Sequence, residues 1–227
     1  MLETRRQIEA ALRASSVFAL LGPEELDRFI ASAMPQFWRA GEPIFLMGDS
    51  GASMMLLQVG EVRISYPSAS GRTVVLNELK PGTLFGEIAL LDGGERSADA
   101  IAITNCQLLV FERRVFIDLL ENNWRVAEAL LKLICGRLRR ADERIGDLAF
   151  FDLPGRLAKE LLERASPGPS GGPRRVSDTQ GMLAALVGGS RETVNRCLRN
   201  WQKGGLITIA DGRISLLDPA ALARVIK

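Results

Sequence analysis

The sequence predicts an α+β chain with an N-terminal double-stranded β-helix (jelly-roll barrel), a long helix and a C-terminal winged helix-turn-helix. Short β-rich segments separated by turn residues run from Phe37 to about Glu112, which is typical of a barrel or sandwich. Apolar residues then recur in alternating steps of four and three from Trp124 to Leu148, which indicates one long helix. Two short helical patterns flank Gly188-Gly189 and indicate a helix-turn-helix.

Composition removes several functional classes. The chain has 227 residues, 47% hydrophobic and 25% charged, enough for one large or two modest domains. No apolar run approaches the ~20 residues of a membrane span and no signal peptide is recognisable, so we expect a cytoplasmic protein without a membrane partner. The lack of histidine and of any CxxC pair argues against metal sites and catalytic triads. We therefore expect no enzyme; a cupin-like jelly-roll enzyme remains a remote alternative.

Turn residues divide the barrel segment into short predicted strands. These are Pro43–Leu46, Ser53–Val59, Glu61–Tyr66, Thr73–Leu79, Ala98–Ile103 and Gln107–Phe111. Turns are predicted between them, for example at Ser70-Gly71 and Pro81-Gly82, because glycine and proline interrupt strands. A helix is predicted to begin at Pro23, where acidic residues fill the first turn, and one helical turn follows Gly86.

The long helix carries a heptad seam. Its apolar positions are Ala127, Leu131, Ile134, Leu138, Ala141, Ile145 and Leu148. Such a seam needs a partner surface to bury it. The barrel of the same chain is one possible partner. We favour the same helix of a second chain, which predicts a parallel homodimer with these residues at its interface.

The C-terminal third contains the predicted DNA-binding elements. Asp152 is a predicted N-cap of a helix over Leu153–Ala165, and the Pro/Gly/Ser-rich loop Ser166–Pro173 follows. The later elements are helices over Thr179–Val187 and Arg191–Gln202 and a hairpin of Leu206–Ile209 and Arg213–Leu216 around Asp211-Gly212. The predicted parts are an effector domain over residues 1–123, a dimerisation helix with its hinge over 124–150, and the winged helix-turn-helix over 151–227.

The predicted helix Arg191–Gln202 has the chemistry of a DNA-reading surface. Arg191, Glu192 and Arg196 lie where a recognition helix meets base edges; arginine pairs with guanine, and glutamate accepts from cytosine. The residues placed to contact the DNA backbone are Thr179, Ser190, Thr193 and Arg199. From Phe151 onwards 12 basic residues face 7 acidic ones, which favours a polyanionic partner. The alternative is a surface Glu192–Arg196 ion pair with no further role.

A second group of candidate functional residues lies inside the barrel segment. Gly86 precedes a short helix, and Arg96 and Ser97 follow Glu87 by nine and ten residues, so a cation and a hydroxyl are available to an anion. Glu87 suits a ligand that also carries a hydroxyl donor, such as a ribose. The alternative is a Glu87–Arg96 salt bridge that stabilises a corner of the barrel.

Several strings together resemble a known family. They are Gly41-Glu42-Pro43-Ile44-Phe45, Gly60-Glu61-Val62, Phe85-Gly86-Glu87-Ile88-Ala89-Leu90-Leu91, Arg96-Ser97-Ala98, Leu148-Ala149-Phe150-Phe151-Asp152 and Ser190-Arg191-Glu192-Thr193-Val194-Asn195-Arg196. In this order, over nearly the whole chain, they resemble the cyclic-AMP receptor protein / fumarate-nitrate regulator (CRP/FNR) superfamily of bacterial transcription regulators.

The resemblance implies a homodimer with a cyclic-nucleotide-binding-type barrel, which binds double-stranded DNA and contacts RNA polymerase. The implied ligand residues are Gly86, Glu87, Ile88, Arg96, Ser97, Ala98, Ala141 and Asp142, with Glu87 on the ribose and Arg96 and Ser97 on the phosphate. Arg191, Glu192 and Arg196 would read a TGTGA-like half-site. Bound ligand would alter the helix seam and a hinge at Phe150-Phe151-Asp152.

One departure concerns the effector. Cyclic-AMP sensors of this family place a Thr-Ser pair on the long helix against adenine, whereas this chain has Ala141-Asp142. Cyclic AMP is the first candidate, with cyclic GMP, another effector or none as alternatives; without an effector the barrel would act only as a dimer scaffold. The three cysteines and the lack of histidine imply neither the iron-sulfur cluster nor the haem of other branches.

Overall fold

The computed structural model describes residues 2–68, 73–168 and 172–226. The predicted turn at Ser70-Gly71 and the middle of the predicted loop Ser166–Pro173 lie outside these ranges. The chain forms two compact units. The first holds the described residues up to Leu138 apart from the first residues of one strand, and the second holds those from Arg139 onwards. No helix in the described ranges is long and apolar enough to cross a membrane.

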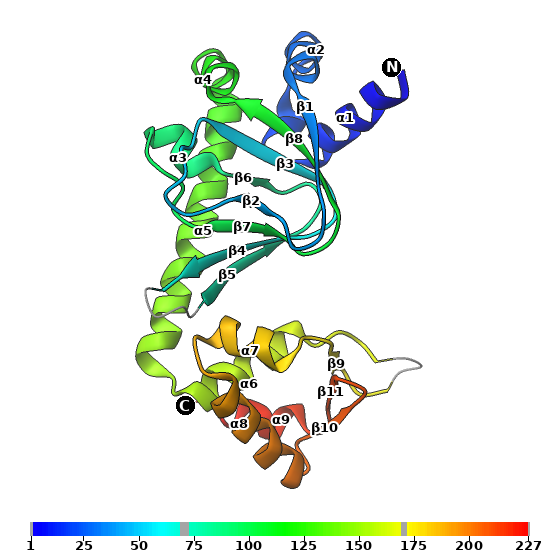
Figure 1. Cartoon of the computed structure of the whole chain (residues 1–227), viewed down its shortest axis with the longest axis vertical. Helices are drawn as coiled ribbons and strands as arrows, with labels where there is room; N and C mark the ends of the chain where they lie inside the picture. The colour runs from blue at the N-terminus through cyan, green and yellow to red at the C-terminus, as the bar shows by residue number, and fades with distance from the viewer. Residues whose placement is uncertain (1, 69–72, 169–171, 227) are drawn as a thin grey trace. The chain divides into compact units, whose positions relative to one another are not determined.

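The first unit is built on two four-stranded sheets that face each other (Figure 1). One sheet has the order β1-β8-β3-β6 and the other β2-β7-β4-β5. The strands are β1 Met34–Trp38, β2 Pro43–Phe45, β3 Ser53–Val59, β4 Val62–Pro67, β5 Thr73–Leu79, β6 Leu84–Phe85, β7 Asp99–Ala102 and β8 Cys106–Glu112. The predicted jelly-roll barrel is thus confirmed, with most strand ends within one residue of the prediction.

Strand β3 is buried on both faces, which explains its continuous apolar sequence. Met54 and Leu56 pack in a core cluster with the helices of this unit, whereas Met55 and Leu57 pack in a second cluster between the sheets. Alternate residues of a strand point to opposite faces, so one strand serves both cores.

Helices cover the outer face of the β1-β8-β3-β6 sheet. They are α1 Leu2–Ala14, α2 Pro23–Ser32, α3 Glu87–Asp92 and α4 Arg113–Asn122, with a short 3-10 turn at Phe18–Leu20. Helix α2 begins at Pro23 as predicted. Strands β1 and β6 and helices α1 and α4 were not predicted. In β1 the side chains of Met34, Pro35, Gln36 and Phe37 are exposed, so the strand has no alternating pattern, and β6 has only two residues.

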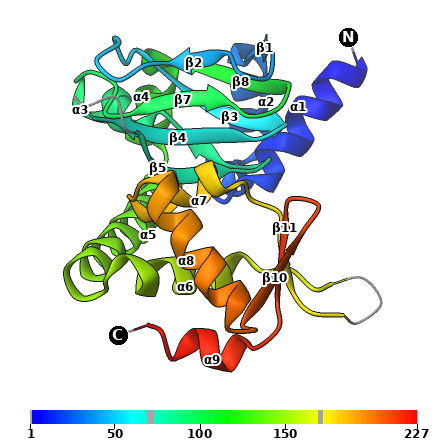
Figure 2. The same cartoon turned by 60° about the horizontal axis from the view of Figure 1, so that its bottom comes forward.

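Helix α5 spans Trp124–Phe150 and continues from one unit into the next. The second unit contains α6 Leu153–Arg164, β9 Arg175–Val176, α7 Gln180–Val187, α8 Arg191–Lys203, β10 Ile207–Ala210, β11 Arg213–Leu216 and α9 Pro219–Ala223. Figure 2 shows α8 beside the β10–β11 hairpin. The hairpin turn, Asp211-Gly212, has positive φ at both positions (51° and 72°), as a primed turn requires. The predicted winged helix-turn-helix is therefore confirmed.

Candidate functional site

Gly86 shapes the entrance to α3. Its φ of +79° lies in the left-handed region that favours glycine. A Cβ atom at this position would lie 2.7 Å from Nη1 of Arg96. The backbone can therefore approach the guanidinium only because the residue is glycine.

Arg96 is a buried cation that forms no ion pair among the described residues, although the charges of Asp49 and Glu87 act on it. Its side chain donates to the carbonyl oxygens of Gly86 (2.8 Å) and Ser53 (2.7 Å) and lies over the ring of Phe45 at 4.3 Å. The residue is 4% exposed, and its Nε has no hydrogen-bond partner among the described residues. Burial lowers the pKa of the guanidinium, while the charges of Asp49 and Glu87 raise it. Because arginine stays protonated, the site keeps a positive charge.

Arg96 and its neighbours line a small cavity of about 70 Å³. The lining residues are Phe45, Ile64, Phe85, Gly86, Glu87, Ile88, Ala89, Arg96, Ser97, Ala98 and Arg137. The structure thus brings together six of the predicted ligand residues, from Gly86 to Ile88 and from Arg96 to Ala98. The other two, Ala141 and Asp142, do not line the cavity; both are exposed on α5.

Glu87 is paired with α5 instead of with Arg96. The glutamate is 1% exposed, and its Oε1 forms an ion pair with Nη1 of Arg137. Nη2 of Arg137 also donates to the carbonyl oxygen of Leu84. The Glu87–Arg96 salt bridge considered as an alternative is not formed. Arg137 was missed by the sequence analysis, because nothing in the sequence distinguishes it from the nearby Arg139 and Arg140.

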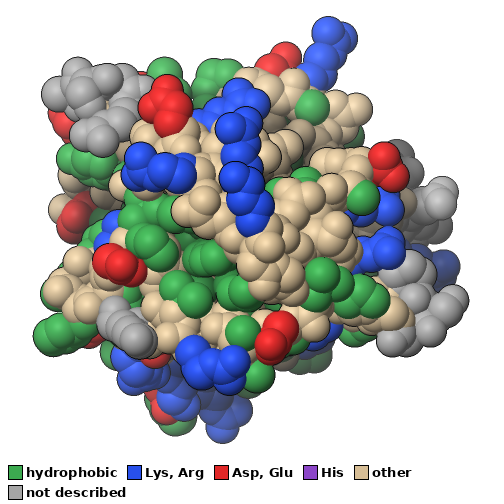
Figure 3. Space-filling view, turned by 90° about the horizontal axis from the view of Figure 1, so that it is seen from below, with side chains coloured by type: hydrophobic (Ala, Val, Ile, Leu, Met, Phe, Trp, Pro, Cys, Tyr) green, Lys and Arg blue, Asp and Glu red, His purple; other side chains and the backbone are tan. Residues whose placement is uncertain are grey.

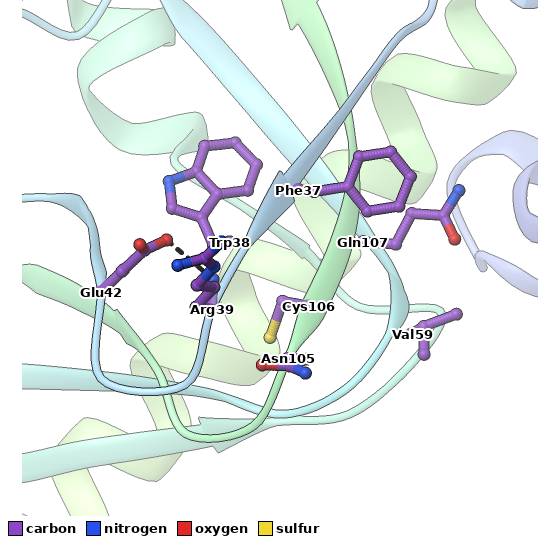
Figure 4. A pocket seen from close by; sticks show the side chains of 8 residues that line it. All are labelled: Phe37, Trp38, Arg39, Glu42, Val59, Asn105, Cys106 and Gln107. Atoms are coloured by element: carbon purple, nitrogen blue, oxygen red, sulfur yellow. Dashed lines mark hydrogen bonds between the residues drawn. The ribbon is translucent and has the colours of Figure 1, made fainter.

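A larger groove of about 630 Å³ lies at one end of the barrel (Figure 4). Phe37 and Trp38 point in different directions there, and Glu42 accepts from the backbone N–H of Arg39 at 2.7 Å. Phe37, Arg39 and Glu42 are all exposed. The groove contains no buried charge that a ligand would neutralise, so the smaller cavity is the candidate site.

The recognition helix α8 presents a polar face. Arg191, Glu192, Arg196 and Arg199 are exposed, whereas Val194, Cys197, Leu198 and Trp201 are buried in the core. No ion pair joins Glu192 and Arg196 in the described part of the chain, so the ion-pair alternative is not observed. Figure 3 shows a row of Lys and Arg side chains on the surface seen from below. The charged side chains of α8 therefore face solvent.

Three of the predicted backbone-contacting residues act in helix caps. Oγ of Ser190 accepts from the backbone N–H of Thr193 at 3.2 Å and lies 3.0 Å from Oγ1 of Thr193. Oγ1 of Thr179 accepts from the N–H of Met182 at 3.2 Å. These caps satisfy N–H groups that a helix start otherwise leaves unpaired. They fix where α7 and α8 begin.

The seam of α5 is largely uncovered in the single chain. Leu131, Leu138, Ile145 and Leu148 are 60% to 63% exposed, and Ala141 is exposed as well. Only Ile134 packs against the barrel core, and Ala127 is half-buried. Within the first unit, the barrel therefore leaves Leu131 and Leu138 exposed.

A cyclic-nucleotide-type barrel joined to a winged helix-turn-helix defines a transcription regulator and not an enzyme. Two family models match the chain: the cyclic nucleotide-binding domain at residues 35–123 and the Crp-like helix-turn-helix domain at residues 155–225.

Known proteins agree with this class. The chain is 35% identical over 216 residues to the cyclic AMP receptor protein of Thermus thermophilus, covering 94% of this chain and 98% of the relative. It is 30% identical over 221 residues to a CRP-like cAMP-activated global transcriptional regulator of Mycobacterium tuberculosis, covering 96% and 99%. The solved c-di-GMP-responsive regulator CLP of Xanthomonas campestris shares the fold, with a TM-score of 0.77, 22% identity and coverage of 86% and 99%. The chain belongs to the CRP/FNR family of transcription regulators.

The Glu87–Arg137 pair gives the first testable prediction. Arg137→Met leaves the Glu87 carboxylate buried without a countercharge and should lower the free energy of unfolding by about 3 kcal/mol. The double variant Glu87→Gln/Arg137→Met buries no charge at this pair and should recover most of the loss. Urea denaturation at pH 7 measures both; a double variant as unstable as the single one would contradict the assignment.

Proposed function

We propose that the protein is a homodimeric transcription regulator that binds a near-palindromic operator and is gated by a cyclic nucleotide in the barrel. The observation that carries the gating is the buried Arg96, which lines the cavity and forms no ion pair among the described residues. A cyclic phosphate would form a direct ion pair with Arg96 and accept charge-assisted hydrogen bonds. Ser97 adds a hydroxyl beside it.

Glu87 would accept a hydrogen bond from the ribose hydroxyl. Ligand pockets usually measure about 300–1,000 Å³, whereas this cavity has about 70 Å³. Arg137 lines the cavity and holds Glu87. We infer that Arg137 moves away from Glu87 when the nucleotide enters, which links the pocket directly to α5.

Adenine is the first candidate for the base of the nucleotide, and guanine is the second. The names of the two relatives mention cyclic AMP and favour it as the first candidate. Ala141 offers no hydrogen-bonding side chain, and Asp142 can accept from an exocyclic amine, so cyclic GMP is the second candidate. A regulator with a different effector or none, whose barrel serves as a dimer scaffold, is the alternative.

The exposed seam of α5 supports the homodimer, because a soluble chain rarely exposes so continuous an apolar stripe. Two recognition helices related by the dimer axis match half-sites about 34 Å apart. Arg191, Glu192 and Arg196 would read each half-site, with Thr179, Ser190, Thr193 and Arg199 on the backbone. The proposed parts are an effector domain (1–123), a dimerisation helix (124–150) and a DNA-binding domain (151–227). RNA polymerase is a further proposed partner.

Replacing Arg96 tests the pocket. Arg96→Gln should weaken binding of cyclic AMP or cyclic GMP by about 100-fold, because charge-assisted hydrogen bonds to the phosphate are lost. Titration calorimetry measures both nucleotides. Arg63→Gln is the matched control, since Arg63 is a half-buried barrel arginine paired with Glu78 at 3.1 Å and does not line the cavity. Equal affinity in wild type and Arg96→Gln would exclude this pocket.

Replacing Arg191 tests base reading. Arg191→Ala should cost about 1–3 kcal/mol on a TGTGA-type inverted repeat and relax the preference at one base position. Arg199→Ala should instead weaken binding to all sequences and reduce the salt dependence. Fluorescence anisotropy with single-base variants at several salt concentrations distinguishes them, and Arg224→Ala in the terminal segment is the control. A uniform loss for Arg191→Ala would mark it as a phosphate contact.

Replacing a seam residue tests the dimer. Leu138→Asp places a carboxylate in the apolar interface, where burial without a partner is costly, and should shift the protein from dimer to monomer. Arg140→Asp introduces the same side chain two residues away, off the seam, and should remain dimeric. Sedimentation velocity reads the outcome; a wild-type monomer would reject the homodimer.

A further inference from the structure

Helices α5 and α6 meet at a sharp elbow formed by Phe150, Phe151 and Asp152. We propose that Arg156 is a positioning residue that locks this elbow to the turn before the recognition helix. On this view the last turns of α5 and the helix-turn-helix move as one body. The inference rests on the proposed function, since it concerns how an effector signal reaches α8.

Arg156 bonds to two backbone carbonyls from different elements. Its Nη1 donates to the carbonyl oxygen of Phe151 in the elbow at 2.7 Å. Its Nε donates to the carbonyl oxygen of Val187 in the last turn of α7 at 3.2 Å. Carbonyls in the last turn of a helix have no partner within that helix, so the arginine satisfies an acceptor that would otherwise need another donor. One rigid guanidinium thus joins the elbow to the end of α7.

Lys159 fixes the other side of the elbow. Its Nζ lies 2.8 Å and 2.6 Å from the two carboxylate oxygens of Asp147, which is in the last turn of α5. The hydrogen bond to Asp147 raises the pKa of Lys159, against the lowering effect of its partial burial. The pair joins α5 to α6 across the elbow, and both side chains are half-buried.

The turn between α7 and α8 packs directly on the start of α6. A Cβ atom at Gly189 would lie 2.3 Å from Cδ1 of Leu153, so the backbone of the turn lies directly against this side chain. The backbone N–H of Gly189 is bonded to the carbonyl oxygen of Ala184 at 2.9 Å, and the cap at Ser190 begins α8 at the next residue. A displacement of α6 is therefore passed to the first turn of the recognition helix through packed atoms.

These contacts change the expectation for the hinge. The sequence suggested Phe150-Phe151-Asp152 as the moving joint, but the elbow is held by Arg156 and by the Asp147–Lys159 pair. The residues from Arg139 onwards, including the last three turns of α5, cluster with the winged helix-turn-helix. We infer that the elbow transmits motion of α5 and does not absorb it.

Hydrogen exchange of the full-length protein tests the lock without ligand or DNA. Arg156→Gln should speed amide exchange in the elbow and in the Gly188–Ser190 turn together by about tenfold, the effect of one lost hydrogen bond. Arg164→Gln is the matched control. Arg164 lies on the same helix and forms two 2.8 Å bonds to Asp178, and its replacement should leave both segments unchanged. Faster exchange in the elbow alone, or equal effects of the two variants, would overturn the lock.

Operator binding with and without cyclic nucleotide tests the consequence. Allosteric coupling typically amounts to about 5–150-fold in affinity. Arg156→Gln should reduce the ratio of the two DNA affinities to near one while the nucleotide affinity stays unchanged. Arg164→Gln should keep the wild-type ratio even where it lowers the thermal unfolding temperature.

Lys159→Met tests the same inference if Arg156→Gln does not fold. Lys159→Met should reduce the coupling, and the exchanged pair Asp147→Lys/Lys159→Asp should restore it. Wild-type coupling in both Arg156→Gln and Lys159→Met would overturn the inference. If operator binding by the wild-type protein does not respond to cyclic AMP or cyclic GMP, the proposed gating is wrong. The hydrogen-exchange experiment alone would then test whether Arg156 locks the elbow.

Discussion

The burial of the Arg96 guanidinium is the constraint on which the effector site depends. An arginine cannot lose its proton in a protein, and a buried charge is costly without partners. Here backbone carbonyls of Gly86 and Ser53 and the face of Phe45 surround it. These groups provide dipoles and a quadrupole, and the charges of Asp49 and Glu87 act on the guanidinium without forming an ion pair with it among the described residues. The arrangement stabilises the buried cation enough for the chain to fold, and the cation can still attract an anion. The close approach of the backbone at position 86 favours glycine there.

Glu87, the buried carboxylate of the cavity, forms an ion pair, whereas Arg96 forms none among the described residues. Glu87 has a full countercharge, but that charge comes from Arg137 on α5. An entering ligand can therefore meet Arg96 without breaking any ion pair of that residue, whereas it reaches Glu87 only in competition with Arg137. This asymmetry gives a physical reason for placing the phosphate at Arg96 and for expecting the long helix to respond to the sugar.

Sequence reasoning worked where structure is set by local signals. Ser190, Gly188-Gly189 and Asp211-Gly212 fix caps and turns through neighbouring residues, so α7, α8 and the hairpin were predictable almost to the residue, whereas β9 and α9 were not predicted. Arg137 and Glu87 are separated by 50 positions, and Arg156 reaches Val187 across 31. Pairings of that kind depend on how the elements pack and leave no periodic trace. Strand β1 was not predicted for another reason: its exposed side chains remove the alternation on which strand prediction relies.

Coupling between two sites requires an element whose state both can bias. Helix α5 meets that requirement by its contacts in each unit. In the first unit Arg137 connects it to Glu87, and in the second Asp147 connects it to Lys159. Between and beside these contacts its apolar seam is exposed, so a second copy can set its position. A helix held by charges at two points, and in the proposed dimer by a partner along one face, has few ways to move without altering both sites.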